Sequence, residues 1–444
     1  MNSSANNTAS RREWHGRVWR LAAPIILSNL SIPLVGAVDT AVVGHLPDPA
    51  YIGAVALGAV VFSFLYWGFG FLRMGTTGFV AQAYGAGELD EMRSSIARAL
   101  LLAVLLGSVV VALQWPIGHA ALWALDADPQ IESLTEDYYR IRVWSAPGAL
   151  LQYVVLGSLI GLQNTRAVLV LQLVLNGTNV VLDLVFVVGF GWDVKGVAAA
   201  TLISECLAAG VGLWLLQRSL RPLGGRYDRT TLLDRVQLTS LLRVNGNIFI
   251  RTLCLISAFA YFTALGSSLG ALTLAANAVL MHLQQFLAYG LDGFAHAAET
   301  LAGSAYGRRD RSAFRAAVRT ATIWAAAVAL VYTALYAIAG TGFIALLTNI
   351  ESVRAEAQRY LPWLIAAPII SVWSFQLDGI FIGTTHTREM RNGMIISLIV
   401  FAAATWSLMS LFGNHGLWAA LMIFMIARAL TLGWWFRRID LALQ

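Results

Sequence analysis

The sequence has few charged residues and almost no cysteine. Charged side chains make up only 12% of the 444 residues, whereas hydrophobic residues make up 58%. A soluble globular domain carries about twice that charged fraction. The two cysteines, Cys206 and Cys254, lie in apolar runs and read as small core residues, which argues against a disulfide framework. The excess apolar surface requires lipid as its solvent, so we expect an integral membrane protein.

The sequence also lacks several motifs that would assign it to other classes. Residues 1–20 are polar and no small-residue cleavage site follows a short apolar core, so we expect no signal peptide. No lipidation signal is present at either end. There is no HExxH motif, no pair of intramembrane histidines and no Walker-type loop. The glycines of GFGWDVKG at 189–196 fit a tight turn between spans. These absences argue against an enzyme, and we expect no cofactor and no resident metal.

Continuously apolar runs of about twenty residues recur along the chain, which is the length needed to cross the hydrocarbon core as a helix. They do not alternate with period two, as the strands of a membrane barrel do, and only helices then satisfy the backbone in lipid. We therefore predict an all-α integral membrane protein with twelve transmembrane helices. The expected spans are 21–45, 53–80, 95–116, 135–161, 167–190, 196–217, 244–266, 272–302, 317–340, 355–383, 393–412 and 416–436.

The basic residues predict the orientation of these spans. One side receives both termini and the loops near 84–98, 163–166, 218–243, 307–319 and 385–391, which together hold 22 arginines. The other side receives five basic residues, namely Arg140, Arg142, Lys195, Arg354 and Arg359. Because basic loops stay in the cytoplasm, we expect both termini there, in a multi-pass protein of the bacterial inner membrane. This bias also accounts for the net charge of +6 without nucleic acid as a partner.

The two halves of the chain repeat at an offset of 222 residues. At this offset Ala83-Tyr84-Gly85 aligns with Ala305-Tyr306-Gly307, and Thr165-Arg166 aligns with Thr387-Arg388. An even number of spans per repeat places both halves the same way up, related by an axis along the membrane normal. We therefore expect two pseudo-symmetric six-helix lobes. The expected segments are 1–20 as a cytoplasmic N-terminal segment, 21–217 as the N-lobe, 218–243 as a cytoplasmic linker, 244–436 as the C-lobe and 437–444 as a cytoplasmic tail.

Two acidic residues inside spans distinguish the first half from the second. Asp39 lies in the first span and Asp183 in the fifth, whereas the matching positions of the second half carry no acid. Asn176, Asn179 and Asp183 are spaced i, i+3, i+7 and share one helical face. Ionisable groups within a membrane are costly and usually functional. Two carboxylates that face each other cannot both stay ionised, so we expect them to share a proton or a small cation. A structural role in helix packing is the alternative.

Several other charged groups inside spans belong to the second half, while Glu205 lies in the sixth span and Arg73 in the second. Asp292 and Glu299 lie in the eighth span and Asp378 in the tenth, while Arg251 of the seventh span is expected to neutralise one of these acids. Glu299 is close to the end of its span, where a solvated helix terminus is the alternative. We predict that Arg251 is structural.

Several long segments of the sequence resemble the multidrug and toxic compound extrusion (MATE) family of transporters, and within it the DNA-damage-inducible F (DinF) branch. The resemblance covers almost the whole chain. The residues that carry it are LAAPIILSNLSIPLVGAVDTAVVGHL at 21–46, AYG at 83–85, LDGFAHAAETLAGSAYG at 291–307 and LDGIFIGTTHTREMRNGM at 377–394.

The resemblance implies an exporter of bulky, often cationic and amphipathic compounds that is coupled to H+ or Na+. It assigns ion coupling to Asp39, Asn179, Asp183 and Thr201, and bending of the first helix to Pro24; Pro33 is a second candidate bend in the same helix. Na+, if it is the coupling ion, would bind the same four residues. The family's other major branch relies on acids of the C-lobe, and an acid is missing here near Arg251.

We expect a monomer in contact with lipid that works by antiport through alternating access. The nearest rival is a flippase for lipid-linked precursors, which would need several basic residues in its cavity to hold a pyrophosphate. Only Arg73 and Arg251 are available for that role.

Overall fold

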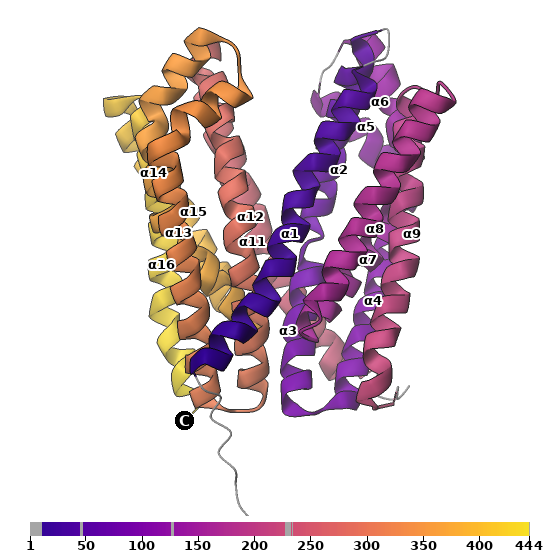
Figure 1. Cartoon of the computed structure of the whole chain (residues 1–444), viewed down its shortest axis with the longest axis vertical. Coiled ribbons are helices and arrows are strands. Elements are labelled where there is room, and N and C mark those ends of the chain that lie inside the picture. Colours follow the sequence, from indigo (N-terminus) through magenta and orange to yellow (C-terminus); the bar gives the residue numbers. More distant parts are fainter. Residues whose placement is uncertain (1–10, 45–47, 126–127, 227–231, 233, 444) are drawn as a thin grey trace, which may run out of the picture. The chain divides into compact units, whose positions relative to one another are not determined.

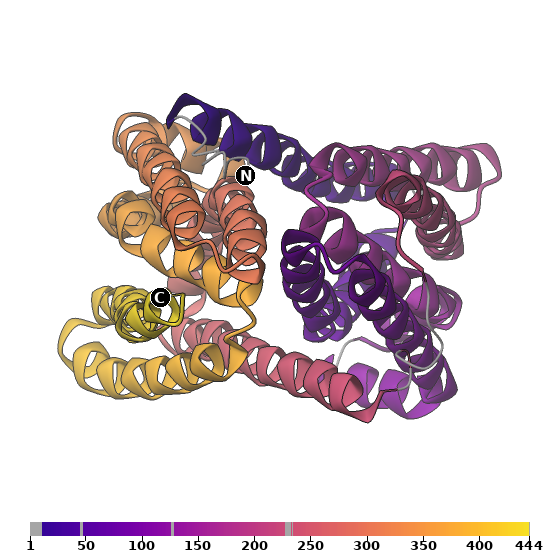
Figure 2. The same ribbon diagram turned by 90° about the horizontal axis from the view of Figure 1, so that it is seen from below.

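The computed structural model describes residues 11–44, 48–125, 128–226, 232 and 234–443. Within these residues twelve helical segments are long and apolar enough to cross a membrane, and no strand is present. The predicted all-α architecture with twelve spans is therefore confirmed. Figures 1 and 2 show the helices from two directions.

The first half of the chain contains helices that are broken at several points within their spans. The helices are α1 (Arg11–Val43), α2 (Ala50–Gly68), α3 (Phe71–Ala86), α4 (Leu89–Ala112), α5 (Gln114–Leu125), α6 (Pro129–Arg142), α7 (Ala146–Gly161), α8 (Thr165–Asp183) and α9 (Val194–Leu220). Short segments of other helix types lie between or beside them: η1 (Val143–Ser145), η2 (Leu184–Gly189) and η3 (Arg221–Leu223). The helices α2 and α3 together make one span, and so do α6, η1 and α7.

The second half consists of longer, uninterrupted helices. They are α11 (Arg235–Ser268), α12 (Ala271–Gly307), α13 (Arg311–Leu347), α14 (Glu351–Gly383), α15 (Thr387–Phe412) and α16 (Asn414–Leu441). Among them, α12 packs on α13 and α14, and α15 packs on α16. Pro362 and Pro368 both lie inside α14.

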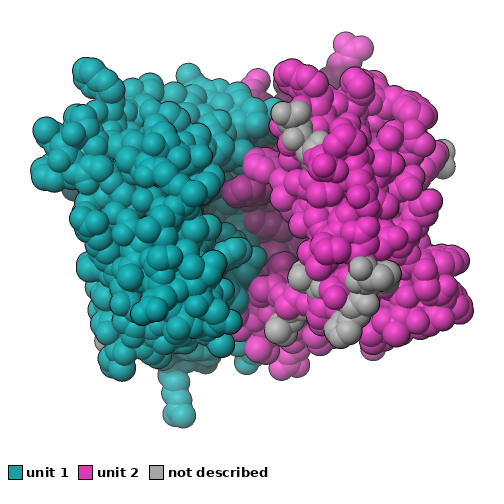
Figure 3. Space-filling view, turned by 90° about the horizontal axis from the view of Figure 1, so that it is seen from above, with its two compact units in different colours: residues 1–26, 85–87, 246–444 teal, residues 27–84, 88–245 magenta. Residues whose placement is uncertain are grey.

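The chain divides into two compact units, coloured separately in Figure 3. Unit 1 comprises residues 1–26, 85–87 and 246–444, and unit 2 comprises residues 27–84 and 88–245. Three helices contribute to both units: α1, α11 and α3, of which only the last two residues, 85 and 86, belong to unit 1. The part of α1 up to Ile26 belongs to unit 1 and the part from Leu27 to unit 2, while α11 changes from unit 2 to unit 1 at Gly246.

The sequence repeat reappears as the same helix packing in each unit. On α7 of unit 2, a Cβ atom added to Gly157 would lie 2.3 Å from the carbonyl oxygen of Arg73, on α3. At the offset of 222, Gly379 on α14 of unit 1 would lie 2.3 Å from the carbonyl oxygen of Ala295, on α12. One turn further on, Gly161 and Gly383 make the equivalent close approaches. Glycines four residues apart allow two helix backbones to touch, which is a common packing mode in membranes.

Within each unit, the arginine-rich connections lie at one end. In unit 2, Arg93 donates to the carbonyl oxygens of Leu220 at 2.8 Å and Gly224 at 2.7 Å. The amide of Asn164 donates to Ser219 Oγ at 2.9 Å, so the 163–166 connection lies at the same end. In unit 1, Arg311 and Arg315 both bind Asp440 near the end of α16. Alternating spans with basic connections on one side produce this arrangement.

Candidate ion-coupling site

Unit 2 brings Asp39 of α1 and Asp183 of α8 together. Their carboxyl groups lie within hydrogen-bonding reach of each other. Asp183 is fully buried, and neither of its oxygens receives a hydrogen bond from a described residue, nor does Oδ1 of Asp39. Two ionised carboxylates have no proton to donate to each other. The pair therefore concentrates negative charge, and no described side chain donates a hydrogen bond to Asp183 or to Oδ1 of Asp39.

The polar face of α8 connects this pair to the neighbouring helices. Asn179 Nδ2 donates to Thr201 Oγ1 of α9 at 3.3 Å, and Thr201 in turn donates to the carbonyl oxygen of Val197 at 3.0 Å. One turn earlier, Asn176 Nδ2 donates to Ser31 Oγ of α1 at 2.6 Å. Asn176 thus joins α8 to α1, and Asn179, four residues before Asp183 on α8, joins α8 to Thr201 on α9.

Asp183 lies where the regular helix ends. It is the last residue of α8, and the π-helical segment η2 begins at Leu184. A π-helical segment within a span widens the helix locally, and such segments are frequent at functional sites. This irregularity could not be read from the apolar run that covers the fifth span.

Both prolines proposed as bending points lie inside α1, which is continuous through them. Pro24 belongs to the part of α1 in unit 1 and Pro33 to the part in unit 2. A proline inside a helix removes one backbone hydrogen bond, so it is a position where bending costs less.

A second charged group lies beside the carboxylate pair. Arg142, at the end of α6, is within range of a Coulombic interaction with Asp39. Its guanidinium donates to Tyr138 Oη at 2.6 Å and lies 3.7 Å from a carboxylate oxygen of Glu205 on α9. The sequence analysis counted Arg142 among the basic residues of one side, near the start of the expected span 135–161; in the structure it lies within the span Pro129–Gly161 and its side chain is 15% exposed. No signal in the linear sequence joined it to Asp39, about a hundred residues earlier.

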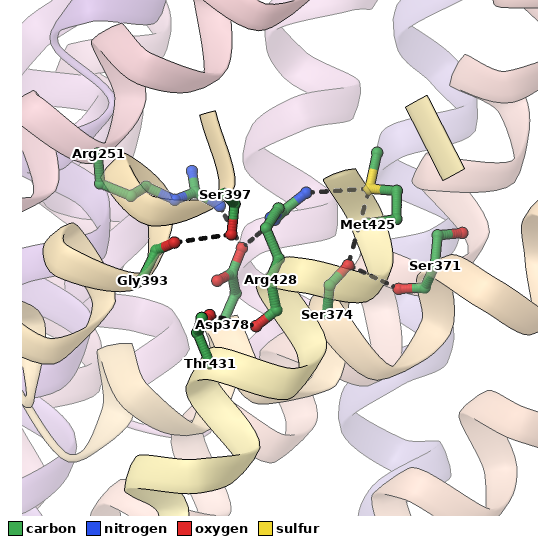
Figure 4. Close-up of polar contacts among 9 residues, drawn as sticks. All are labelled: Arg251, Ser371, Ser374, Asp378, Gly393, Ser397, Met425, Arg428 and Thr431. Atoms are coloured by element: carbon green, nitrogen blue, oxygen red, sulfur yellow. Dashed lines mark hydrogen bonds and ion pairs between the residues drawn. The ribbon is translucent and has the colours of Figure 1, made fainter. Parts of the chain in front are cut away.

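The main charged cluster of unit 1 is centred on Asp378 of α14 (Figure 4). Arg251 of α11 and Arg428 of α16 both donate to its Oδ2 atom, Arg428 at 2.5 Å. All three side chains are buried. Arg428 also contacts the sulfur atom of Met425 at 3.2 Å. Sequence reasoning gave Arg428 no role, although an arginine in the middle of an apolar run was a visible signal.

The remaining candidates of unit 1 lie on α12. Glu299 pairs with His296 Nδ1 at 2.8 Å and is only 1% exposed, so it is not the solvated helix terminus considered from the sequence. Asp292 interacts electrostatically with Arg428. Arg251, Asp378 and Asp292 therefore belong to one charged neighbourhood, whereas Glu299 has a partner of its own on the same helix.

Comparison with known proteins identifies the class to which this architecture belongs. A solved structure described as the outward-facing conformation of a multidrug resistance MATE family transporter of the MOP superfamily superposes with a TM-score of 0.88. The match covers 97% of this chain and 96% of that one at 20% sequence identity. The chain therefore shares the fold of that structure, a polytopic bundle whose described residues include twelve helical segments able to cross a membrane.

Sequence comparison narrows this class to a family. The family model described as MatE matches residues 24–185 and again residues 248–407, once in each half of the chain. The DNA damage-inducible protein F of Escherichia coli (strain K12) is 41% identical over 421 residues, which is 95% of this chain and 92% of that protein. A probable multidrug resistance protein NorM of Rhizobium meliloti (strain 1021) is 25% identical over 94% of this chain and 92% of that protein. The chain belongs to the MATE family of multidrug transporters, in the DinF branch, and is not an enzyme.

Proposed function

We propose that this transporter exports bulky amphipathic or cationic compounds in exchange for H+ or Na+. Ion coupling takes place at Asp39 and Asp183, with Asn179 and Thr201 as neutral oxygen donors. The two lobes, residues 21–217 and 244–436, alternate between access to the two sides of the membrane and are joined by the segment 218–243. Both termini are cytoplasmic, and the protein works as a monomer in the inner membrane.

The observation that carries this proposal is the buried carboxylate pair. Asp39 and Asp183 lie within hydrogen-bonding reach of each other, and three of their four oxygens receive no donor from described residues. Two like charges at about 4 Å repel by about 4 kcal/mol at an effective dielectric constant of about 20. A single positive charge, whether a proton shared between the oxygens or a bound cation, removes this repulsion. A pair of this kind therefore takes up one charge readily and is costly to leave empty.

The composition of the site is compatible with both coupling ions. A carboxylate pair can hold one proton between its oxygens. Carboxylate, amide and hydroxyl oxygens are also the hard ligands that alkali and alkaline-earth cations prefer, and Asn179 and Thr201 add such groups.

Loading the pair provides a way to change the shape of α1. Asp39 is on the same helix as Pro24 and Pro33, the two positions where a backbone hydrogen bond is absent. Neutralisation of Asp39 and Asp183 removes the repulsion between α1 and α8, which lets α1 bend and displaces the substrate. The membrane potential contributes about 2.3 kcal/mol per 100 mV for each charge moved across.

The pairing of the buried arginines of unit 1 argues against a flippase for lipid-linked precursors. A flippase for lipid-linked pyrophosphate needs basic side chains that are available to the substrate. Arg251 and Arg428 instead share the single carboxylate of Asp378. We expect the substrate to be held by apolar and aromatic side chains with few charges, which suit amphipathic compounds better than a pyrophosphate.

Transport by purified protein in lipid vesicles tests the proposal. A proton gradient or a Na+ gradient is imposed alone, and uptake of a fluorescent cationic dye is recorded for the wild type, Asp39→Asn and Asp137→Asn. Asp137 pairs with Lys195 at 3.2 Å in an exposed position, so Asp137→Asn is a matched control for the loss of an acid. We expect one gradient to drive transport by the wild type and the control, and no transport by Asp39→Asn. Equal transport by all three proteins contradicts the proposed coupling site.

A further inference from the structure

Arg142 has more hydrogen-bonding capacity than its surroundings use. One terminal nitrogen donates to Tyr138 Oη, but the other stands 3.7 Å from Glu205, longer than a hydrogen bond. Its Nε atom has no acceptor among the described residues, and Oε2 of Glu205 makes no hydrogen bond with them. The guanidinium also lies over the ring of Phe62, with a distance of 4.6 Å to the centroid. An arginine that is 15% exposed and is held by one hydroxyl group, an aromatic face and an ion pair at 3.7 Å can exchange its acidic partner for another.

A second potential partner of Arg142 is Asp39. The two groups interact electrostatically, and Tyr138, which accepts from Arg142, also interacts with the charge of Asp39. Arg142 thus interacts with two acids, Glu205 on α9 at 3.7 Å and, through its charge, Asp39 on α1. The other titratable and charged groups that face this cluster from the neighbouring helices are Tyr66, Arg73, Tyr153, Asp183 and Cys206.

We infer that Arg142 is an internal cation that competes with the coupling ion for the Asp39 carboxylate, and that Glu205 holds Arg142 back. When the ion occupies the Asp39–Asp183 pair, Arg142 is drawn to Glu205. When the ion leaves, Arg142 turns toward Asp39 and partly replaces the lost charge. Arg142 and Glu205 are therefore positioning residues that set the affinity for the coupling ion. This inference rests on the proposed function, because it assumes that the carboxylate pair binds that ion.

The first test is Glu205→Gln, measured as the coupling-ion concentration that gives half-maximal transport in vesicles. The neutral amide no longer attracts Arg142, so the arginine competes more strongly at Asp39 and more ion is required. We expect the half-maximal concentration to rise on the order of tenfold, the effect of one opposite charge beside a carboxylate. Glu205→Asp keeps the charge and should remain near the wild-type value, which separates charge from general damage. Glu136→Gln breaks the exposed Arg140–Glu136 pair on α6, the helix that carries Arg142, at 2.6 Å, and serves as the matched control for the loss of an acid.

The second test separates competition by Arg142 from a direct effect of the Glu205 charge. Arg142→Gln removes the competing cation, so the half-maximal concentration should fall below the wild-type value. In this background, Glu205→Gln should have no further effect, because there is no arginine left to release. A direct electrostatic effect of Glu205 on the ion would persist. If Arg142→Gln does not fold, Arg142→Met replaces it as a second neutral variant, and there too Glu205→Gln should have no further effect.

The outcomes distinguish this inference from the proposed function. If the wild type depends on the ion and Asp39→Asn is inactive, but Glu205→Gln transports at the wild-type ion concentration, the inference is wrong and the coupling site stands. If the shift caused by Glu205→Gln persists unchanged in Arg142→Gln, competition by the arginine is also refuted. If Asp39→Asn transports normally, the proposed function itself fails.

Discussion

Replacing Asp39 and Asp183 by asparagine, singly and together, tests whether the two carboxylates act as one unit. The two groups lie within hydrogen-bonding reach, and the repulsion between two charges at about 4 Å is about 4 kcal/mol at an effective dielectric constant of about 20. This repulsion is relieved when one ion binds, so it contributes up to about a thousandfold to the ion affinity. An asparagine at either position removes the repulsion and with it this contribution.

The expected result is a non-additive series. Asp39→Asn and Asp183→Asn should each abolish coupled export, and the double variant should be little worse than either, because all three disable the same site. Since an amide mimics a protonated acid and leaves no buried charge, the variants should remain folded and should still bind substrate in detergent.

Two measurements check this series. Dye transport under an imposed gradient reports coupling, and the shift of the unfolding midpoint on addition of the ion reports binding. The wild type should be stabilised by the ion, whereas the three variants should not. Normal export by Asp39→Asn would refute the reasoning and direct attention to Asp292, Glu299 and Asp378. Loss of export that is additive in the double variant would show that the two acids act at separate sites.

Three further predictions concern the rest of the molecule. Arg251→Met should lower the unfolding temperature of the purified protein by the equivalent of about 1–3 kcal/mol, because Asp378 loses one of its two buried arginine partners and keeps Arg428; full stability with abolished transport would contradict a structural role. Gly383→Ala should destabilise by about 1–3 kcal/mol, because its Cβ atom would lie 2.0 Å from the carbonyl oxygen of Glu299. Gly433→Ala, which meets no atom within 4 Å, is the matched control and should unfold at the wild-type temperature. Reporter domains fused to the C-terminus should be active only in a cytoplasmic format, and activity on the periplasmic side would overturn the orientation.

The number of spans, the repeat and the candidate acids could be predicted from the sequence because each depends on local composition. A run of about twenty apolar residues can satisfy its backbone in lipid only as a helix. The glycines at 161 and 383 coincide at the offset of 222 because each lets one helix backbone touch another. The spacing of Asn176, Asn179 and Asp183 likewise places them on one face of α8 without reference to any other helix.

The partners of these groups were decided only by the tertiary structure. The sequence analysis only assigned Arg142 to one side of the membrane, whereas the packing of α6 against α9 brings it to 3.7 Å from Glu205 and within electrostatic range of Asp39. In the same way, Arg428 reaches Asp378 from α16, and Glu299 pairs with His296. Helical periodicity determines which face a side chain occupies, but the neighbour of that face depends on how distant helices pack. A buried charge must find its counter-charge across such a contact, and this pairing is a property of the folded chain.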